Sequence, residues 1–360
     1  MRIFILLAAV LAALAGAFTP QTSAQAGRGV PGSPEFGYGA RLELDGIYLD
    51  QALELAADLR FDWLVVPVRW SAMQPGTPYW AKLDGVMAFA ARNQMAVMIS
   101  LTQPPASALT ADGPDPAQTA ALAQGLARRY AGTLQAMELF PAANLRSGWG
   151  ADPNPKQYAS LYNQVSAQLA AANLPVLLVG CGLQPLAAAP VAGEMDDLAF
   201  LQAVYDASAH PPVISLLLID ADIDPLAAPG ASNRRALRHY EEVRQVMTGA
   251  GQQSGMLWIT AIRAPSGTID SAKAHSNEPQ QSTWIYQAYA QIRSQLYIGV
   301  AVYQSLNPVD PPSSAHALVT SEQYHPIAAI FRDLLSQNGE VVPLPRYGRP
   351  KDEGLKKQKP

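Results

Sequence analysis

Short apolar runs alternate with amphipathic stretches along most of this chain, and the alternation occurs eight times. The runs are continuous and rich in Val, Ile and Leu, which is typical of parallel strands buried on both faces. We predict strands at residues 37–42, 64–68, 96–101, 134–140, 176–181, 213–219, 256–261 and 298–304. Helices are predicted after them at residues 49–59, 80–93, 116–131, 155–172, 195–207, 233–250, 279–294 and 322–336.

Eight strand–helix units predict an α/β protein, a closed (β/α)8 TIM barrel over residues 35–340. A doubly wound open sheet is the alternative, but it does not need eight regularly spaced units. A leader rich in Pro and Gly, 27–34, precedes the barrel. The basic segment 341–360 follows it, and its lack of apolar periodicity predicts disorder.

The first 26 residues have the pattern of a secretory signal: Met1-Arg2, an apolar run from Ile3 to Ala17, and small residues up to Ala26. An uncleaved anchor is the alternative, although the run is shorter than the roughly 20 residues of a spanning helix. We therefore expect a secreted or extracytoplasmic protein that begins at Gly27. No later stretch is long and apolar enough to predict a membrane span.

Composition narrows the classes of partner and cofactor. The chain is 49% hydrophobic with a formal charge of −4, so it can bury a large core, and nucleic acid is not expected as its main partner. Its single cysteine, Cys181, ends an apolar run and is predicted to be a small strand-end residue. No spacing of His and Cys predicts a metal site, no phosphate loop is found, and no cofactor is expected. The oligomeric state stays open.

Two strand ends carry the functional signal. Residues 138–150 contain the end of the fourth predicted strand and the loop after it, and residues 257–263 include the end of the seventh. They resemble the corresponding stretches of retaining glycoside hydrolases with a (β/α)8 barrel, such as families 5 and 39. In those families the fourth strand runs into Asn-Glu-Pro-Asn, whose Glu is the general acid/base, and the seventh ends at Thr-Glu, whose Glu is the nucleophile. The same positions here hold Ala142 and Ala261, so the resemblance implies that both catalytic glutamates are replaced.

Alanine can neither donate a proton nor form a glycosyl–enzyme bond, so this pattern predicts an inactive, glycoside-hydrolase-like pseudoenzyme that retains carbohydrate binding. One alternative is an active glycoside hydrolase that uses other carboxylates, with Asp220 after the sixth strand as the first candidate. Another is a structural or protein-binding scaffold. Asn277-Glu278-Pro279 contains the missing motif, but no strand precedes it, and we predict that Glu278 lies at a helix N-terminus.

The expected ligand is an oligosaccharide or a cell-wall glycan, bound by aromatic and polar side chains at the carboxyl ends of the strands. We predict that Glu138 points into the barrel, where it pairs with Arg69, and that Trp258 faces the helices as a core residue. The residues predicted to bind the ligand lie at strand ends or in the loops that follow them: Arg69, Trp70, Asn144, Trp149, Arg263 and Tyr303.

Overall fold

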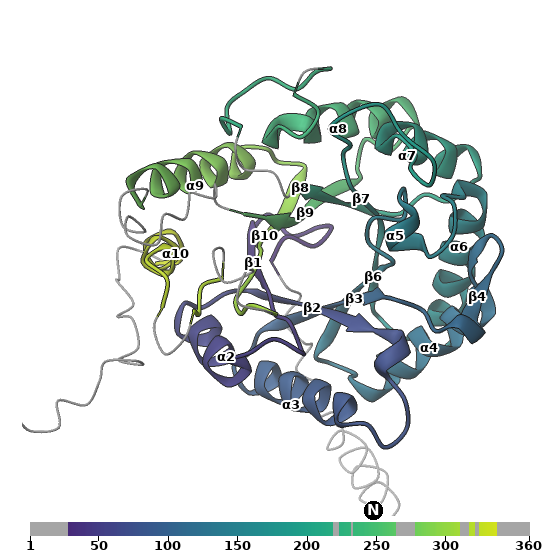
Figure 1. Ribbon diagram of the computed structural model, residues 1–360, viewed down its shortest axis with the longest axis horizontal. Coiled ribbons are helices and arrows are strands. Elements are labelled where there is room, and N and C mark those ends of the chain that lie inside the picture. Colours follow the sequence, from purple (N-terminus) through teal and green to yellow (C-terminus); the bar gives the residue numbers. More distant parts are fainter. Residues whose placement is uncertain are drawn as a thin grey trace, which may run out of the picture.

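The computed structural model describes residues 28–218, 223–231, 233–263, 278–309, 317–320 and 324–336. Eight parallel strands close into a barrel, and Figure 1 looks along its axis. Hydrogen bonds between β1 and β10 complete the ring, so the predicted (β/α)8 barrel is confirmed. In order around the barrel the strands are β1 (Gly37–Arg41), β2 (Trp63–Arg69), β3 (Ala96–Thr102), β6 (Leu134–Leu139), β7 (Leu177–Leu183), β8 (Val213–Leu218), β9 (Met256–Ile262) and β10 (Ile298–Tyr303).

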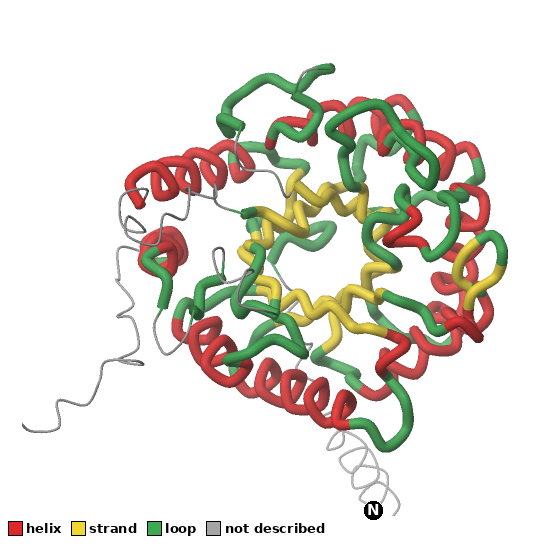
Figure 2. The backbone as a smooth tube through the Cα atoms, in the orientation of Figure 1, coloured by secondary structure: helices red, strands yellow, loops and turns green. Residues whose placement is uncertain are grey.

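Helices surround the strands as an outer ring (Figure 2). The main helices are α2 (Leu49–Asp58), α3 (Pro78–Arg92), α4 (Pro116–Arg129), α6 (Pro155–Ala171), α7 (Asp197–Asp206), α8 (Tyr240–Gly249), α9 (Glu278–Arg293) and α10 (Ile327–Leu335). Local sequence explains several starts. The Asp115 carboxylate accepts a hydrogen bond from the Gln118 amide, 2.8 Å away, and Pro116 follows as the first residue of α4. As predicted, Glu278 begins a helix.

Most predicted elements are present with shifted ends. Helix α8 begins at Tyr240 and not near residue 233, because a 3₁₀ turn, η3 (Leu237–His239), precedes it. The sequence analysis missed a small hairpin, β4 (Leu109–Thr110) with β5 (Gly113–Pro114), and the short helix α5 (Arg146–Trp149). It also missed the short 3₁₀ turns η1 (Trp70–Ala72) and η2 (Ala106–Ala108). Short elements like these carry too few residues to show a periodicity.

The barrel interior has its own apolar layer, separate from the core between strands and helices. It includes Val65, Met98, Val179 and Val300, which lie on strands all around the ring. Trp258 belongs to this interior layer, where its ring centroid lies 4.8 Å from that of Trp63. The prediction that Trp258 faces the helices was therefore wrong. In a strand buried on both faces, apolar character does not reveal which parity points inward.

The residues just before β1 close the amino-terminal end of the barrel, which we call the base. Trp63 Nε1 donates to the Arg28 carbonyl oxygen at 2.7 Å, and Trp258 Nε1 donates to the Gly29 carbonyl oxygen at 2.9 Å. Gly29 has a φ of 77°, and a Cβ there would collide with the backbone of Gly299. Only glycine fits this close approach comfortably. Part of the predicted leader is thus packed against the barrel.

A buried histidine joins the start of α7 to the start of α8. His239 is fully buried, and its ring nitrogens lie 2.6 Å from the Asp197 carboxylate and 2.7 Å from the Glu242 carboxylate. Burial favours the neutral ring, but the hydrogen bonds to Asp197 and then Glu242 outweigh it, so the pKa of His239 is raised. Arg234 adds a cation 3.7 Å from Asp197 and also pairs with Asp196. The cluster fixes two helices next to the loop that follows β8.

Candidate functional site

The carboxyl ends of β6 to β9 bring Ala142 and Ala261 into one small apolar cluster. Leu145, Leu186 and Leu217 complete this cluster, and all five residues are buried. We call the carboxyl end of the barrel the mouth, and we call this cluster the mouth floor. Two positions more than a hundred residues apart in the sequence therefore meet where the resemblance placed the acid/base and the nucleophile. The methyl and isobutyl groups of the mouth floor offer no proton and no nucleophile.

A strained turn after β6 delivers Ala142 to the mouth floor. Phe140 and Ala142 both have a positive φ, 52° and 60°, which is uncommon for residues with a side chain. The Ala142 amide donates to the Gly182 carbonyl oxygen at 2.6 Å, which ties the turn to β7. A Cβ at Gly148 would collide with the carbonyl oxygens of Pro141 and Ala142, so the chain needs glycine where α5 folds over the turn. The backbone geometry of the loop that carries Ala142 is thus tightly specified.

Asn144 holds this loop and does not face the mouth. Its side-chain amide donates to the carbonyl oxygens of Gln184 at 3.0 Å and Met195 at 2.9 Å, while its Oδ1 accepts from the Gln184 amide at 3.0 Å. The residue is fully buried. The prediction that Asn144 binds a ligand is corrected: its polar atoms join the β6 loop to the β7 loop.

Trp149 is also part of the core. Its side chain has no exposed surface, and its ring centroid lies 5.9 Å from Phe140 and 5.6 Å from Tyr158. Its Nε1 donates to the Asp112 carbonyl oxygen at 2.8 Å, which fastens the β4–β5 hairpin to α5. A stacking platform needs an exposed ring face, so Trp149 does not serve as one. Helix α5, which the sequence analysis missed, turns the ring inward.

Tyr303 points away from the mouth as well. It is fully buried, and its ring centroid lies 4.9 Å from that of Phe331 on α10. Val300 and Val302 fill the barrel interior, so simple alternation along β10 turns Tyr303 toward the helices. The predicted ligand role of Tyr303 is therefore wrong. Its place at a strand end suggested that it faces the mouth, but its position in the alternation along β10 directs it toward the helices.

A polar layer lies inside the barrel at the level of Glu138, which is 1% exposed. Its carboxylate accepts a hydrogen bond from the Ser100 hydroxyl and a longer one, 3.4 Å, from the Thr260 hydroxyl. The prediction that Glu138 points inward is correct, but its partners are these hydroxyls and not Arg69. Because the side chain is enclosed by the barrel, it has no open path to a ligand at the mouth.

Arg69 lies at the rim of the mouth, where β2 ends. It is exposed, it forms an ion pair with Asp45, and its guanidinium lies 5.8 Å from the centroid of the Tyr79 ring. Lys82 approaches the same Asp45 carboxylate at 3.3 Å. Two cations therefore share one carboxylate. The sequence analysis missed Asp45 and Lys82, although Asp45 follows the first strand and so belongs to the same end of the barrel.

Two of the three remaining candidates, Trp70 and Arg263, are described by the structure. Trp70, in η1, is half-buried and packs against the main core with part of its ring exposed. Arg263 directly follows β9 and is half-buried. Asp220, the candidate replacement acid, lies outside the described residues. Arg69, Trp70 and Arg263 thus remain candidates for ligand binding.

The described part of the chain contains neither a group of side chains suited to a metal ion nor a reactive thiol. Among those residues, no three His, Cys, Asp or Glu side chains are grouped so that they could hold a metal ion. Cys181 is fully buried, and burial raises the pKa of its thiol well above the ordinary value, so the reactive thiolate is disfavoured. No helix within the described ranges is both long and apolar enough to cross a bilayer.

Comparison with known proteins places the fold among glycoside hydrolases. XacCel5A, solved in complex with cellopentaose, superposes with a TM-score of 0.57 at 9% identity, covering 82% of this chain and 97% of its own. An endo-β-1,4-glucanase from Xanthomonas axonopodis pv. citri gives 0.54 at 11% identity, covering 82% and 97%. A family 30 subfamily 8 xylanase from Clostridium acetobutylicum gives 0.50 at 14% identity, covering 82% and 70%.

At such low identity these similarities show the fold alone, a (β/α)8 barrel like those of glycoside hydrolases. No protein-family model matches the sequence. No curated protein matches it either.

Proposed function

We propose that this chain is an exported barrel of glycoside hydrolase fold that binds a glycan at its mouth without hydrolysing it. The observation that carries the proposal is the mouth floor, in which Ala142 and Ala261 lie together among three leucines. Retaining hydrolysis needs two carboxyl groups about 5–5.5 Å apart at these strand ends. A pair of methyl groups supplies neither the proton donor nor the nucleophile.

The buried Glu138 does not replace the missing pair. It lies in the barrel interior, engaged by Ser100 and Thr260, and its 1% exposure separates it from any ligand above the mouth floor. A general acid must come within hydrogen-bond reach of the leaving oxygen. Glu138 therefore supports the fold, and its position is compatible with an inactive barrel.

Glycan binding is supported by the side chains left open at the rim. Arg69 is exposed beside Asp45 and Lys82, and Trp70 presents part of its ring next to Arg69 in the sequence. Charged groups pair with sugar hydroxyls, and an exposed indole can stack on the apolar face of a sugar ring. The structural neighbour solved with cellopentaose shows that a barrel of this fold can hold an oligosaccharide. Export is proposed from the amino-terminal signal pattern.

A binding experiment with matched arginine variants tests the proposal. The purified protein is applied to a panel of immobilised glycans, and the retained glycan is then titrated with wild type, Arg69→Ala and Trp70→Ala. Arg92→Ala is the control, because Arg92 is also exposed and also lies over an aromatic ring, Phe89, but at the far end of α3. We expect at least about tenfold weaker binding for both rim variants, because Arg69→Ala removes about one charge-assisted hydrogen bond and Trp70→Ala removes the stacking surface. Equal affinity for all four proteins refutes the rim as the binding site.

A second candidate function, protein binding, is favoured by apolar side chains exposed in loops around the mouth. They are Ile47 after β1, Val191 after β7, Leu226 after β8 and Val309 after β10. A contiguous exposed apolar patch is typical of interaction surfaces, and the Ile47 amide donates to the carbonyl oxygen of Pro308, next to Val309, at 3.0 Å. If no glycan is retained and the paired variant Ile47→Ser with Val309→Ser loses a protein partner, the scaffold function replaces glycan binding.

A further inference from the structure

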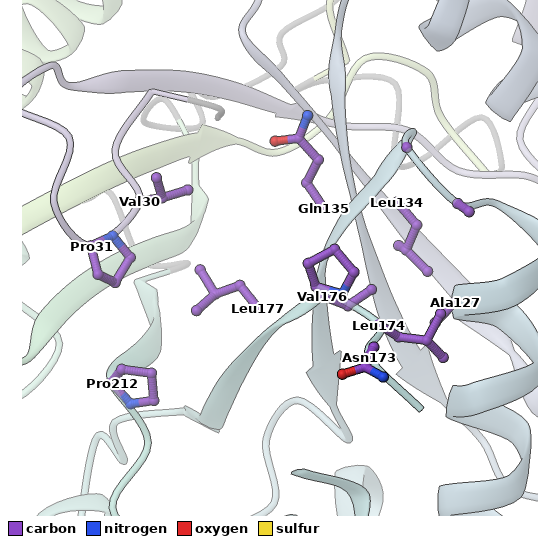
Figure 3. A pocket seen from close by; sticks show the side chains of 13 residues that line it. Val30, Pro31, Ala127, Leu134, Gln135, Asn173, Leu174, Val176, Leu177 and Pro212 are labelled. Atoms are coloured by element: carbon purple, nitrogen blue, oxygen red, sulfur yellow. The ribbon is translucent and has the colours of Figure 1, made fainter. Parts of the chain in front are cut away.

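A groove of about 760 Å³ opens at the base of the barrel, on the opposite side from the mouth. Its walls come from the residues before β1, the end of α4, the loop from α6 to β7, and the starts of β6, β7 and β8. Figure 3 shows Val30, Pro31, Leu177 and Pro212 around one part of the space. This volume lies within the range of small-molecule sites, about 300–1,000 Å³.

The chemistry of the groove is apolar and uncharged. None of its lining residues carries a charge, and the only polar side chains among them are Gln135 and Asn173. Val30 and Leu177 also pack against the apolar layer inside the barrel, so the groove continues the interior core outward to the surface. An open apolar space of this kind favours a hydrocarbon chain over a sugar or an ion, since an ion would lose its hydration without gaining a partner.

The order of the sequence indicates where such a chain comes from. The apolar run Ile3–Ala17 is joined to Arg28 by only ten residues, 18–27. Arg28 and Gly29 are bonded to the base through Trp63 and Trp258, and Val30 lines the groove. A linker of that length reaches about 40 Å at most. In the form of the chain that keeps residues 1–26, the linker therefore holds the base of the barrel close to the lipid whenever the apolar run is in a bilayer.

We propose that the base groove binds the hydrocarbon chain of a membrane lipid. The lipid tail inserts between the leader residues and the start of β7, and its headgroup stays in water. Each buried methylene contributes about 0.8 kcal/mol, which corresponds to roughly fourfold in affinity. Affinity therefore rises with tail length until the groove is filled and then becomes constant. The groove lies at the opposite end of the barrel from the mouth, so this proposal can be tested independently of glycan binding.

Alkylphosphocholines of increasing tail length test the proposal when they are titrated into the full chain below their critical micelle concentrations. We expect binding that tightens by about fifteenfold for every two added methylenes and then reaches a plateau. Two variants target the groove. Ala131→Trp fills it from an exposed loop position, and Val176→Asp places a charge in its half-buried wall. Ala188→Trp is the control, because Ala188 is exposed in the loop after β7 at the mouth.

Both groove variants should weaken tail binding at least tenfold, while Ala188→Trp should leave it unchanged. Ala131→Trp keeps the test informative if Val176→Asp fails to fold. Equal binding by wild type and Ala131→Trp overturns the proposal. So does a dimer that Ala131→Trp dissociates, because the occupant is then a second copy. Binding that appears only after residues 1–26 are removed also overturns it, because the groove is then filled by the chain's own amino-terminal segment.

Discussion

Replacing Trp149 with alanine separates a structural role for this residue from a ligand-binding one. The indole is fully buried, it packs against Phe140 and Tyr158, and it holds the Asp112 carbonyl oxygen through a 2.8 Å hydrogen bond. Truncating a buried tryptophan to alanine costs about 3–5 kcal/mol, and the lost hydrogen bond is included in the upper part of that range. Because proteins are stable by only about 5–15 kcal/mol, the change should be large.

The assay is urea unfolding followed by far-ultraviolet circular dichroism, with Trp70→Ala measured beside Trp149→Ala. Trp70 is only half-buried, so its variant should lose about 1 kcal/mol of stability or less while it loses glycan affinity. Trp149→Ala should show the opposite pattern, with a midpoint at lower urea concentration and little change in affinity once folded. A loss below about 1 kcal/mol, together with lost glycan binding, would refute the structural role.

Two other predictions concern the base and the buried histidine. Gly29 and Gly32 both have a positive φ, but of the two only Gly29 would bring an added Cβ into contact with another part of the chain. Gly29→Ala should therefore have a free energy of unfolding in urea that is lower than that of Gly32→Ala by about 2 kcal/mol or more. Equal stability would refute close packing at the base. Because the folded pKa of His239 is raised, its stabilisation should be complete below the unfolded pKa of about 6.5 and be lost as pH rises through the folded pKa. His239→Gln should flatten that part of the pH–stability profile, and an unchanged profile would contradict the assignment.

Sequence patterns were sufficient for the architecture because each strand and helix carries its own signal. Continuous apolar runs marked every barrel strand within a few residues, and the amphipathic stretches between them marked the main helices, although α8 and α10 begin later than predicted. The number of units then selected the closed barrel. These are local properties of each strand and helix, and they do not depend on the conformation of the loops between them.

The lining of the mouth could not be predicted in the same way. The positive φ of Phe140 and Ala142 redirects the loop after β6, so Asn144 and Trp149 turn inward although they follow a strand end. Tyr303 shows a second limit, because strands buried on both faces do not reveal which residues face the barrel interior. The pairing of Ala142 with Ala261 was recoverable only through the resemblance, since no local pattern connects two distant strand ends.

Side-chain contacts join the loops at the mouth around Ala142 and Ala261. Asn144 closes the gap between the β6 and β7 loops with three hydrogen bonds, and three leucines cover the space around the two alanines. This apolar packing lies where the resemblance placed two carboxylates. It supports the proposal that the mouth binds a glycan without hydrolysing it.

Incubating the purified full chain with a mixed panel of oligosaccharides and aryl glycosides, followed by mass analysis of the products, tests the central claim most directly. The account predicts no hydrolysis product and selective retention of one class of glycan. Products that form with the wild type and disappear with Asp220→Asn would contradict it, because the chain would then be an active glycoside hydrolase with relocated carboxylates.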